Sequence, residues 1–203
     1  TPGHMGNHVC FQYDKILFSG DHIMGWATSM VSPPYGDLTQ FMNSCRLLQK
    51  ENFKNIVFDN KEELAAIIIE PLVQCAGGFK FHNDSTLKFI SEIAKENNIL
   101  FIVDEIATGF GRTGTMFAFQ NSKILPDIIC LGKALTGGAI SLASVVSTDA
   151  VYETFLSDKD EDALMHGPTY MSNPLACAAA NASINLFKNQ PRLEQVKNIE
   201  RDL

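Results

Sequence analysis

The chain has 203 residues, of which 45% are hydrophobic and 19% are charged, and its mean hydropathy is close to zero. Such values are typical of a globular protein of one domain or slightly more, and they exclude the disordered, fibrous and membrane-spanning classes. The formal net charge of -7, with acidic and basic residues interspersed, argues against a nucleic-acid partner.

The five cysteines are irregularly spaced and form no CxxC pair. This pattern predicts reduced thiols and no zinc site. No apolar run is long enough to span a membrane, and no basic and then apolar leader opens the chain. We therefore expect a cytoplasmic protein with no metal site and no membrane partner.

Residues 1–60 show no clear periodicity, and we treat them as a separate N-terminal segment that need not be one continuous stretch of a longer protein. From residue 61 onward the pattern is regular. The isoleucine-rich run 65–70 predicts a strand, Gly77-Gly78 predicts a turn, and residues 85–97 predict a helix. One face of this helix is apolar and should pack on a sheet. Its members are Leu87, Ile90, Ile93 and Ala94.

Three further apolar runs, at 99–103, 127–131 and 141–147, predict strands. Because these runs are apolar on both faces, helices should cover both faces of the sheet. A last helix should begin at Asn173-Pro174, a cap residue followed by a proline, and its alanine-rich sequence suits close packing. Together these elements predict an α/β fold with a largely parallel sheet.

Charged residues follow three of the predicted strands: Glu70, Asp104-Glu105 and Lys133. In open α/β sheets, ligands bind beyond the carboxyl ends of the strands. Any one of these residues, taken alone, is better explained as a helix cap or as the partner of a surface counter-ion. Their occurrence at three strand ends favours a common site.

Lys133 lies between small residues in a turn after an apolar strand, where a desolvated amine can act as a nucleophile toward a carbonyl. A surface lysine is the alternative if Lys133 is considered by itself. Asp104 changes the balance, because a carboxylate at the end of a neighbouring strand can keep a pyridine nitrogen protonated. A Schiff-base lysine together with such an acid is the pattern of pyridoxal 5'-phosphate (PLP) enzymes.

Two glycine-rich turns flank these residues, at 108–114 and 136–138, and neither matches a Walker loop or a dinucleotide-binding fingerprint. Their glycines would let the backbone approach a cofactor. In the loop 165–174, the Thr169 hydroxyl is suited to bind a phosphate, although a plain capping turn explains the loop equally well. His166 has no suitably spaced partner for a metal ion.

Three strings resemble the class III aminotransferases of PLP fold type I: residues 66–71 (AIIIEP), 101–114 (FIVDEIATGFGRTG) and 126–134 (PDIICLGKA). The resemblance implies the α/β large domain of that fold, with a mostly parallel sheet flanked by helices and with PLP as the cofactor. Residues 61–190 would form the core of this PLP-binding domain. Residues 191–203 would begin the connection to a small domain that the chain lacks.

The same resemblance implies roles for the matched residues. Lys133 would carry the Schiff base and move the substrate proton, and Asp104 would pair with the pyridinium nitrogen. Thr169 would bind the phosphate of the neighbouring subunit's cofactor, because the family is dimeric and shares its active sites between subunits. The remaining implied contacts are Ile106, Pro168 and a stacking Phe18 for the cofactor, and Gly167 and Glu70 for the substrate.

Within the family, residues 166–171 (HGPTYM) and 173–183 (NPLACAAANAS) are similar to members of the biotin pathway. This similarity implies amino transfer from S-adenosylmethionine to 8-amino-7-oxononanoate by a homodimer that binds small-molecule substrates. Two alternatives stay open. One is an ω-aminotransferase for an ornithine-like or 4-aminobutyrate-like substrate, and the other is a truncated, non-catalytic homologue, since the chain is much shorter than family members.

Overall fold

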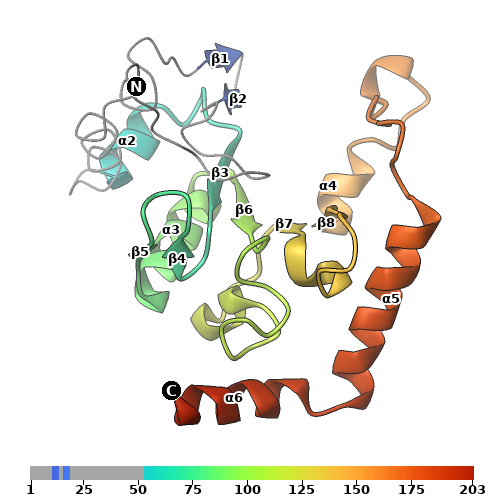
Figure 1. Cartoon of the computed structure of the whole chain (residues 1–203). Helices are drawn as coiled ribbons and strands as arrows, with labels where there is room; N and C mark the ends of the chain where they lie inside the picture. The colour runs from blue at the N-terminus through green and yellow to red at the C-terminus, as the bar shows by residue number, and fades with distance from the viewer. Residues whose placement is uncertain (1–10, 14–15, 19–52) are drawn as a thin grey trace, which may run out of the picture. The chain divides into compact units, whose positions relative to one another are not determined.

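The computed structural model describes residues 11–13, 16–18 and 53–203, with side chains from Phe53 onward (Figure 1). The chain divides into two compact units. Unit 1 is Thr1–Phe101 and unit 2 is Ile102–Leu203. The boundary falls inside strand β6 (Leu100–Asp104), so this strand takes part in both units. The domain limits predicted at residues 60 and 190 remain predictions.

Unit 1 contains short antiparallel pairs in addition to its main strand and helices. Strand β1 (Phe11–Tyr13) pairs with β2 (Ile16–Phe18), and β4 (Val73–Gln74) pairs with β5 (Lys80–Phe81) across the predicted glycine turn. Strand β3 (Ala66–Ile69) lies within the predicted run 65–70. The strands β1 and β2 and the helix α2 (Phe53–Asp59) fall in the segment where no element was predicted.

Helix α3 (Asp84–Glu96) confirms the helix predicted at 85–97. It begins where Asn83 Oδ1 accepts a hydrogen bond from the backbone N–H of Thr86 at 2.9 Å, which satisfies a donor that has no partner inside the helix. The predicted apolar face is also confirmed, because three of its four members are buried and the fourth is half-buried. These are Leu87, Ile93 and Ala94, followed by Ile90.

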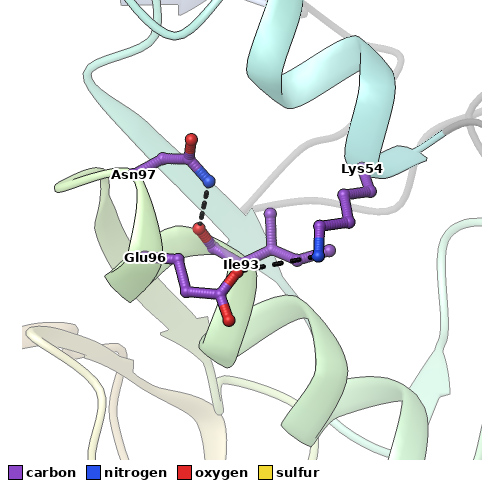
Figure 2. Close-up of polar contacts among 4 residues, drawn as sticks. All are labelled: Lys54, Ile93, Glu96 and Asn97. Atoms are coloured by element: carbon purple, nitrogen blue, oxygen red, sulfur yellow. Dashed lines mark hydrogen bonds and ion pairs between the residues drawn. The ribbon is translucent and has the colours of Figure 1, made fainter.

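The C-terminal end of α3 is fixed by two polar contacts, which Figure 2 shows. Asn97 Nδ2 donates to the carbonyl oxygen of Ile93 at 2.8 Å, and the same carbonyl also accepts from the backbone N–H of Asn97 at 3.2 Å. Lys54 of α2 lies 3.9 Å from a Glu96 carboxylate oxygen. Both ion-pair side chains are largely exposed, so this pair adds little to the stability of the unit.

The main sheet has the strand order β3-β6-β7-β8. In unit 1, the N–H of Leu100, the first residue of β6, donates to the carbonyl of Ala65. In unit 2, β6 runs parallel to β7 (Ile128–Leu131), and β8 (Ser144–Ser147) runs antiparallel to β7. The α/β fold predicted from the sequence is confirmed, with β8 as an antiparallel member of the sheet.

Strand β8 differs from the prediction in its start and in its burial. It begins at Ser144 rather than Ser141, because its pairing with β7 begins where Ser144 stands opposite Leu131, the last residue of β7. Val145 and Val146 point to opposite faces and are 66% and 49% exposed. Within the described residues, no strand pairs with the outer edge of β8. Helices flank the sheet as predicted, but they leave these two valines of β8 exposed.

Unit 2 is built around the packing of helix α5 (Pro174–Asn189) on the 3₁₀ helix η3 (Lys133–Thr136). Helix α5 begins as predicted, with Asn173 Oδ1 accepting from the N–H of Leu175 at 3.0 Å. Its small buried residues admit a close approach, and they are Ala176, Ala180 and Ser183. The buried core cluster consists of Phe110, Leu131, Leu135 and Ala180.

The remaining elements of unit 2 are η2 (Ala118–Ser122), α4 (Asp149–Glu153), η4 (Asp160–Asp162) and α6 (Arg192–Asp202). The described helices include none that is both long and apolar enough to cross a bilayer.

We expect Ala180→Leu to lower the free energy of unfolding by about 1–3 kcal/mol, because a larger side chain must enter a filled contact with Phe110 and Leu135. Ala178→Leu, on the exposed side of the same helix, is the matched control and should change this free energy by at most about 0.5 kcal/mol. Urea unfolding followed by circular dichroism measures both. Equal effects of the two variants would show that Ala180 does not face the core.

Candidate active site

Asp104 and Lys133 lie at the same edge of the sheet. Asp104 is the last residue of β6, and it stands opposite Cys130 in the parallel pairing with β7. Lys133 follows β7 after Gly132 and begins η3. Because parallel strands end at the same edge, the two residues that the sequence singled out are brought together, and the Lys133 charge acts on the Asp104 carboxyl.

The Asp104 side chain is only 6% exposed, and its carboxylate is held in one orientation. Its Oδ1 atom accepts a hydrogen bond from the backbone N–H of Ile106 at 2.9 Å. Burial raises the pKa of this carboxyl above its usual value, while the Ile106 N–H and the Lys133 charge lower that pKa in part. Within the described residues Oδ2 accepts no hydrogen bond, so it is available to a donor from a ligand.

Lys133 has a φ of 43°, a left-handed backbone conformation that residues other than glycine seldom adopt. The surrounding contacts hold this conformation. The Ser183 Oγ of α5 lies 3.4 Å from the carbonyl oxygen of Ala134, the next residue in η3. The expected desolvation of Lys133 is wrong for the described residues, since its side chain is exposed at the open end of the strand. The amine is therefore accessible to a ligand.

Gly132 brings the turn before Lys133 close to Ile106, one of the predicted cofactor contacts. A Cβ atom at position 132 would lie 3.3 Å from Ile106 Cγ2, which is tighter than an ordinary contact. Ile106 is half-buried and stands two residues after Asp104. Glycine at position 132 therefore lets Ile106 pack beside the strand end that carries both candidate residues.

Glu105 and Cys130 are residues of this edge to which the sequence assigned no role. Glu105 is fully buried and accepts hydrogen bonds from Thr108 Oγ1 at 2.6 Å and from the N–H of Phe119 at 2.9 Å. Burial raises the pKa of the Cys130 thiol, and the neighbouring Asp104 carboxylate raises that pKa further. The sequence did offer a signal for Glu105, because it is a second acidic residue directly after Asp104 at the end of an apolar strand.

Two predicted residues lie in unit 1. Glu70 follows β3, and its Oε2 atom accepts from the N–H of Cys75 at 2.9 Å, while His82 Nε2 lies 2.8 Å from its carbonyl oxygen. Glu70 thus fastens the β4–β5 hairpin to the end of β3. Phe18 ends β2, but its side chain lies outside the described residues. The substrate and cofactor roles of these two residues stay predictions.

Gly167, Pro168 and Thr169 lie on an exposed loop between η4 and α5. The loop closes a turn in which the Met171 N–H donates to the Pro168 carbonyl at 2.9 Å. No hydrogen bond within the described residues joins these three to Asp104 or Lys133. Their exposure agrees with the expectation that Thr169 serves a neighbouring subunit, which stays a prediction.

Other kinds of site find no support among the described residues. No group of three or more His, Cys, Asp or Glu side chains in the described part of the chain could hold a metal ion. A pocket of about 400 Å³ in unit 1 includes no predicted site residue, and its lining consists of Lys61, Glu62, Leu64, Ala65 and residues 96–98. Among the described residues, the sheet edge with Asp104 and Lys133 is therefore the candidate site with the clearest support.

We expect the stability of the cofactor-free chain to depend on pH through Asp104. Burial raises the pKa of this carboxyl, so the folded chain keeps a proton that the unfolded chain releases near pH 3.8. The Asp104 contribution to stability must therefore fall as pH rises from about 4 through the raised pKa. Asp104→Asn has no proton to lose, so its free energy of unfolding relative to the wild type should increase over this range. Urea unfolding at several pH values measures the difference, and a flat or falling difference would contradict it.

The chain is similar to known proteins of one family. The model of the family "Aminotransferase class-III" matches residues 22–203. The adenosylmethionine-8-amino-7-oxononanoate aminotransferase of Buchnera aphidicola subsp. Schizaphis graminum is 47% identical over 153 residues, which are 75% of this chain and 35% of the relative. The chain therefore spans about a third of the length of this curated relative.

Two solved structures are similar at the level of the fold and of the sequence. The structure of the aminotransferase of the same name from Methanocaldococcus jannaschii has a TM-score of 0.69 at 33% identity and covers 83% of this chain and 42% of its own. An amine transaminase from an uncultivated Pseudomonas species, solved in a PLP-bound form, has a TM-score of 0.62 at 31% identity and covers 78% of this chain and 34% of its own.

Proposed function

We propose that this chain, which belongs to the class III aminotransferases, binds PLP through Lys133 and Asp104 and transfers amino groups with it. The observation that carries the proposal is the position of these two residues at the carboxyl ends of neighbouring parallel strands. PLP supplies an aldehyde that combines with amines and a ring that accepts the electrons released when a proton leaves the substrate.

The residues at this edge fit such a cofactor. The exposed Lys133 Nζ would hold the cofactor covalently, and the same amine would take a proton from the substrate and return it. The Asp104 carboxylate, fixed through Oδ1 by Ile106, can accept a ring N–H at Oδ2. Its burial strengthens this charge-assisted hydrogen bond. We also assign Ile106 to the residues that would contact the cofactor.

For the substrates, we propose S-adenosylmethionine as the amino donor and 8-amino-7-oxononanoate as the acceptor, which gives 7,8-diaminononanoate. The support is the 47% identity to a relative that carries this activity in its name. We also infer that Gly167 and Glu70 contact the substrate. The rival is an ω-aminotransferase acting on an ornithine-like or 4-aminobutyrate-like donor.

We further propose a cytoplasmic homodimer in which Thr169 and Pro168 of one subunit bind the cofactor phosphate of the other. The support is the surface around this loop, where several large apolar side chains are exposed. They are Leu164, Met165, Tyr170 and Met171. Apolar side chains gathered on one exposed loop are typical of an interface. The cytoplasmic location is supported by the free thiols of Cys130 and Cys177, since reduced cysteines are typical of that compartment.

The proposal is tested by loading the purified chain with PLP, reducing it with borohydride and mapping the labelled peptide by mass spectrometry. The label should be on Lys133. A label on another lysine, or none, would contradict the proposal. The loaded protein is then mixed with S-adenosylmethionine, ornithine or 4-aminobutyrate in turn, and the donor that bleaches the visible band identifies the substrate class. Bleaching by ornithine and not by S-adenosylmethionine would favour the rival.

A further inference from the structure

Glu105 is the most completely buried charged residue of the described chain, yet the proposed reaction gives it no task. Its side chain has no solvent exposure. A buried carboxylate is costly unless donors surround it. Here both oxygens have one, because Thr108 Oγ1 donates to Oε2 and the Phe119 N–H donates to Oε1.

These donors come from two segments that the carboxylate holds together. Thr108 belongs to the turn that leaves β6, and Phe119 lies 14 residues after Glu105, in η2. The segment of Phe119 is itself anchored, since the Phe119 ring stacks on Phe117 at 5.9 Å and Phe117 packs edge-on against Phe110 of the core. Glu105 thus ties the turn after β6 to a fixed part of unit 2.

The same turn holds Asp104 in its orientation. The N–H that fixes Asp104 Oδ1 belongs to Ile106, the residue directly after Glu105. The Glu105 backbone has little room to move, because its N–H donates to the Cys130 carbonyl and its carbonyl accepts from Gly109, each at 2.9 Å. A Cβ atom at position 109 would lie 2.9 Å from the Glu105 carbonyl oxygen, so the turn closes tightly.

We propose that Glu105 is a positioning residue for Asp104: its buried carboxylate fixes the turn that presents the Ile106 N–H, and thereby aims Asp104 Oδ2 at the cofactor nitrogen. The role of Asp104 toward a cofactor rests on the proposed function. The hydrogen bonds by which Glu105 holds the turn are present in the chain without cofactor. Glu105 touches no cofactor itself. Its effect passes through one peptide unit to the Asp104 carboxylate.

The first test is amide hydrogen exchange at Ile106 in the chain without cofactor. Glu105→Ala should speed this exchange by about 10-fold or more, because the turn is released. Glu105→Gln keeps an acceptor for Phe119 and a partner for Thr108, so it should stay within about 3-fold of the wild type. Gln120→Ala is the matched control, since it removes the 3.0 Å hydrogen bond to the Phe117 N–H from the same segment but leaves Glu105 in place.

The second test is a double-mutant cycle read out by the dissociation constant for PLP. Glu105→Ala should weaken binding by about 10-fold, and Glu105→Ala combined with Asp104→Asn should be within about 3-fold of Asp104→Asn alone, because both changes act on one carboxylate. Thr108→Val, which removes one donor, replaces Glu105→Ala if that variant does not fold, and it should act in the same direction.

The possible failures are distinguishable. Unchanged exchange at Ile106 in Glu105→Ala, or exchange in Glu105→Gln as fast as in Glu105→Ala, would overturn the positioning role. Additive effects on PLP affinity would also overturn it, since Glu105 would then act only on stability. If the wild type bound no PLP, the proposed function would fail, whereas the exchange at Ile106 would still decide whether Glu105 orients Asp104.

Discussion

Replacing Lys133 with alanine should remove the visible absorbance of covalently held PLP and lower the turnover of the loaded protein by about 10²–10⁴-fold, the usual contribution of a positioned acid–base group. The reason is the position of its amine, which is exposed beside the buried Asp104 and held in a left-handed turn by the contact between η3 and α5. Absorbance spectra and single-turnover kinetics with the identified donor measure both effects.

Two control variants test whether the effect is due to the amine of Lys133 itself. One keeps a positive charge at position 133, and the other removes a lysine elsewhere in the chain. Lys133→Arg keeps a cation beside Asp104 but forms no stable bond with the aldehyde, so it should lose the band as the alanine variant does. Lys188→Ala removes an exposed lysine from α5 and should leave band and turnover unchanged. A band that survives in Lys133→Ala and disappears in another lysine variant would refute the assignment.

The part of the site that could be predicted from the sequence depends on local rules. Apolar runs fixed the places of β6 and β7, and parallel strands end at one edge, so Asp104 and Lys133 had to lie near each other once both strands were recognised. Capping chemistry likewise predicted the start of α5 at Asn173. In each of these places, residues near one another in sequence determine where an element begins or ends.

Other features depend on partners that are distant in sequence. The burial of Glu105 follows from its contact with Phe119, which no periodicity indicates. The antiparallel direction of β8 depends on how the turn after η3 reverses the chain. The exposure of Lys133 depends on which residues from elsewhere in the chain pack over the end of β7. The hairpin β4–β5 was missed because its strands have two residues each, too few for an alternating pattern.

Replacing Asp104 with asparagine should weaken PLP binding by about 10- to 150-fold and slow amino transfer by about 10²–10³-fold. The first range is the loss of one hydrogen bond to a charged group, and the second is the loss of one preorganised electrostatic partner. Asparagine keeps the shape of the side chain and an acceptor for the Ile106 N–H, but it cannot keep a ring nitrogen protonated. Asp160→Asn, at an exposed position of η4, is the control for removal of a carboxylate and should have neither effect.

The role of Asp104 can be isolated with a cofactor whose ring nitrogen carries a methyl group. Such a ring is permanently positive and needs no carboxylate to hold a proton, so the rate difference between Asp104→Asn and the wild type should shrink to about 10-fold or less, the part that is due to electrostatic attraction alone. A rate difference that stays as large as with PLP would mean that Asp104 acts only by holding the strand end in place. Since Oδ1 is already bound to the Ile106 N–H, the outcome depends on Oδ2, the oxygen that the turn leaves open to a ligand.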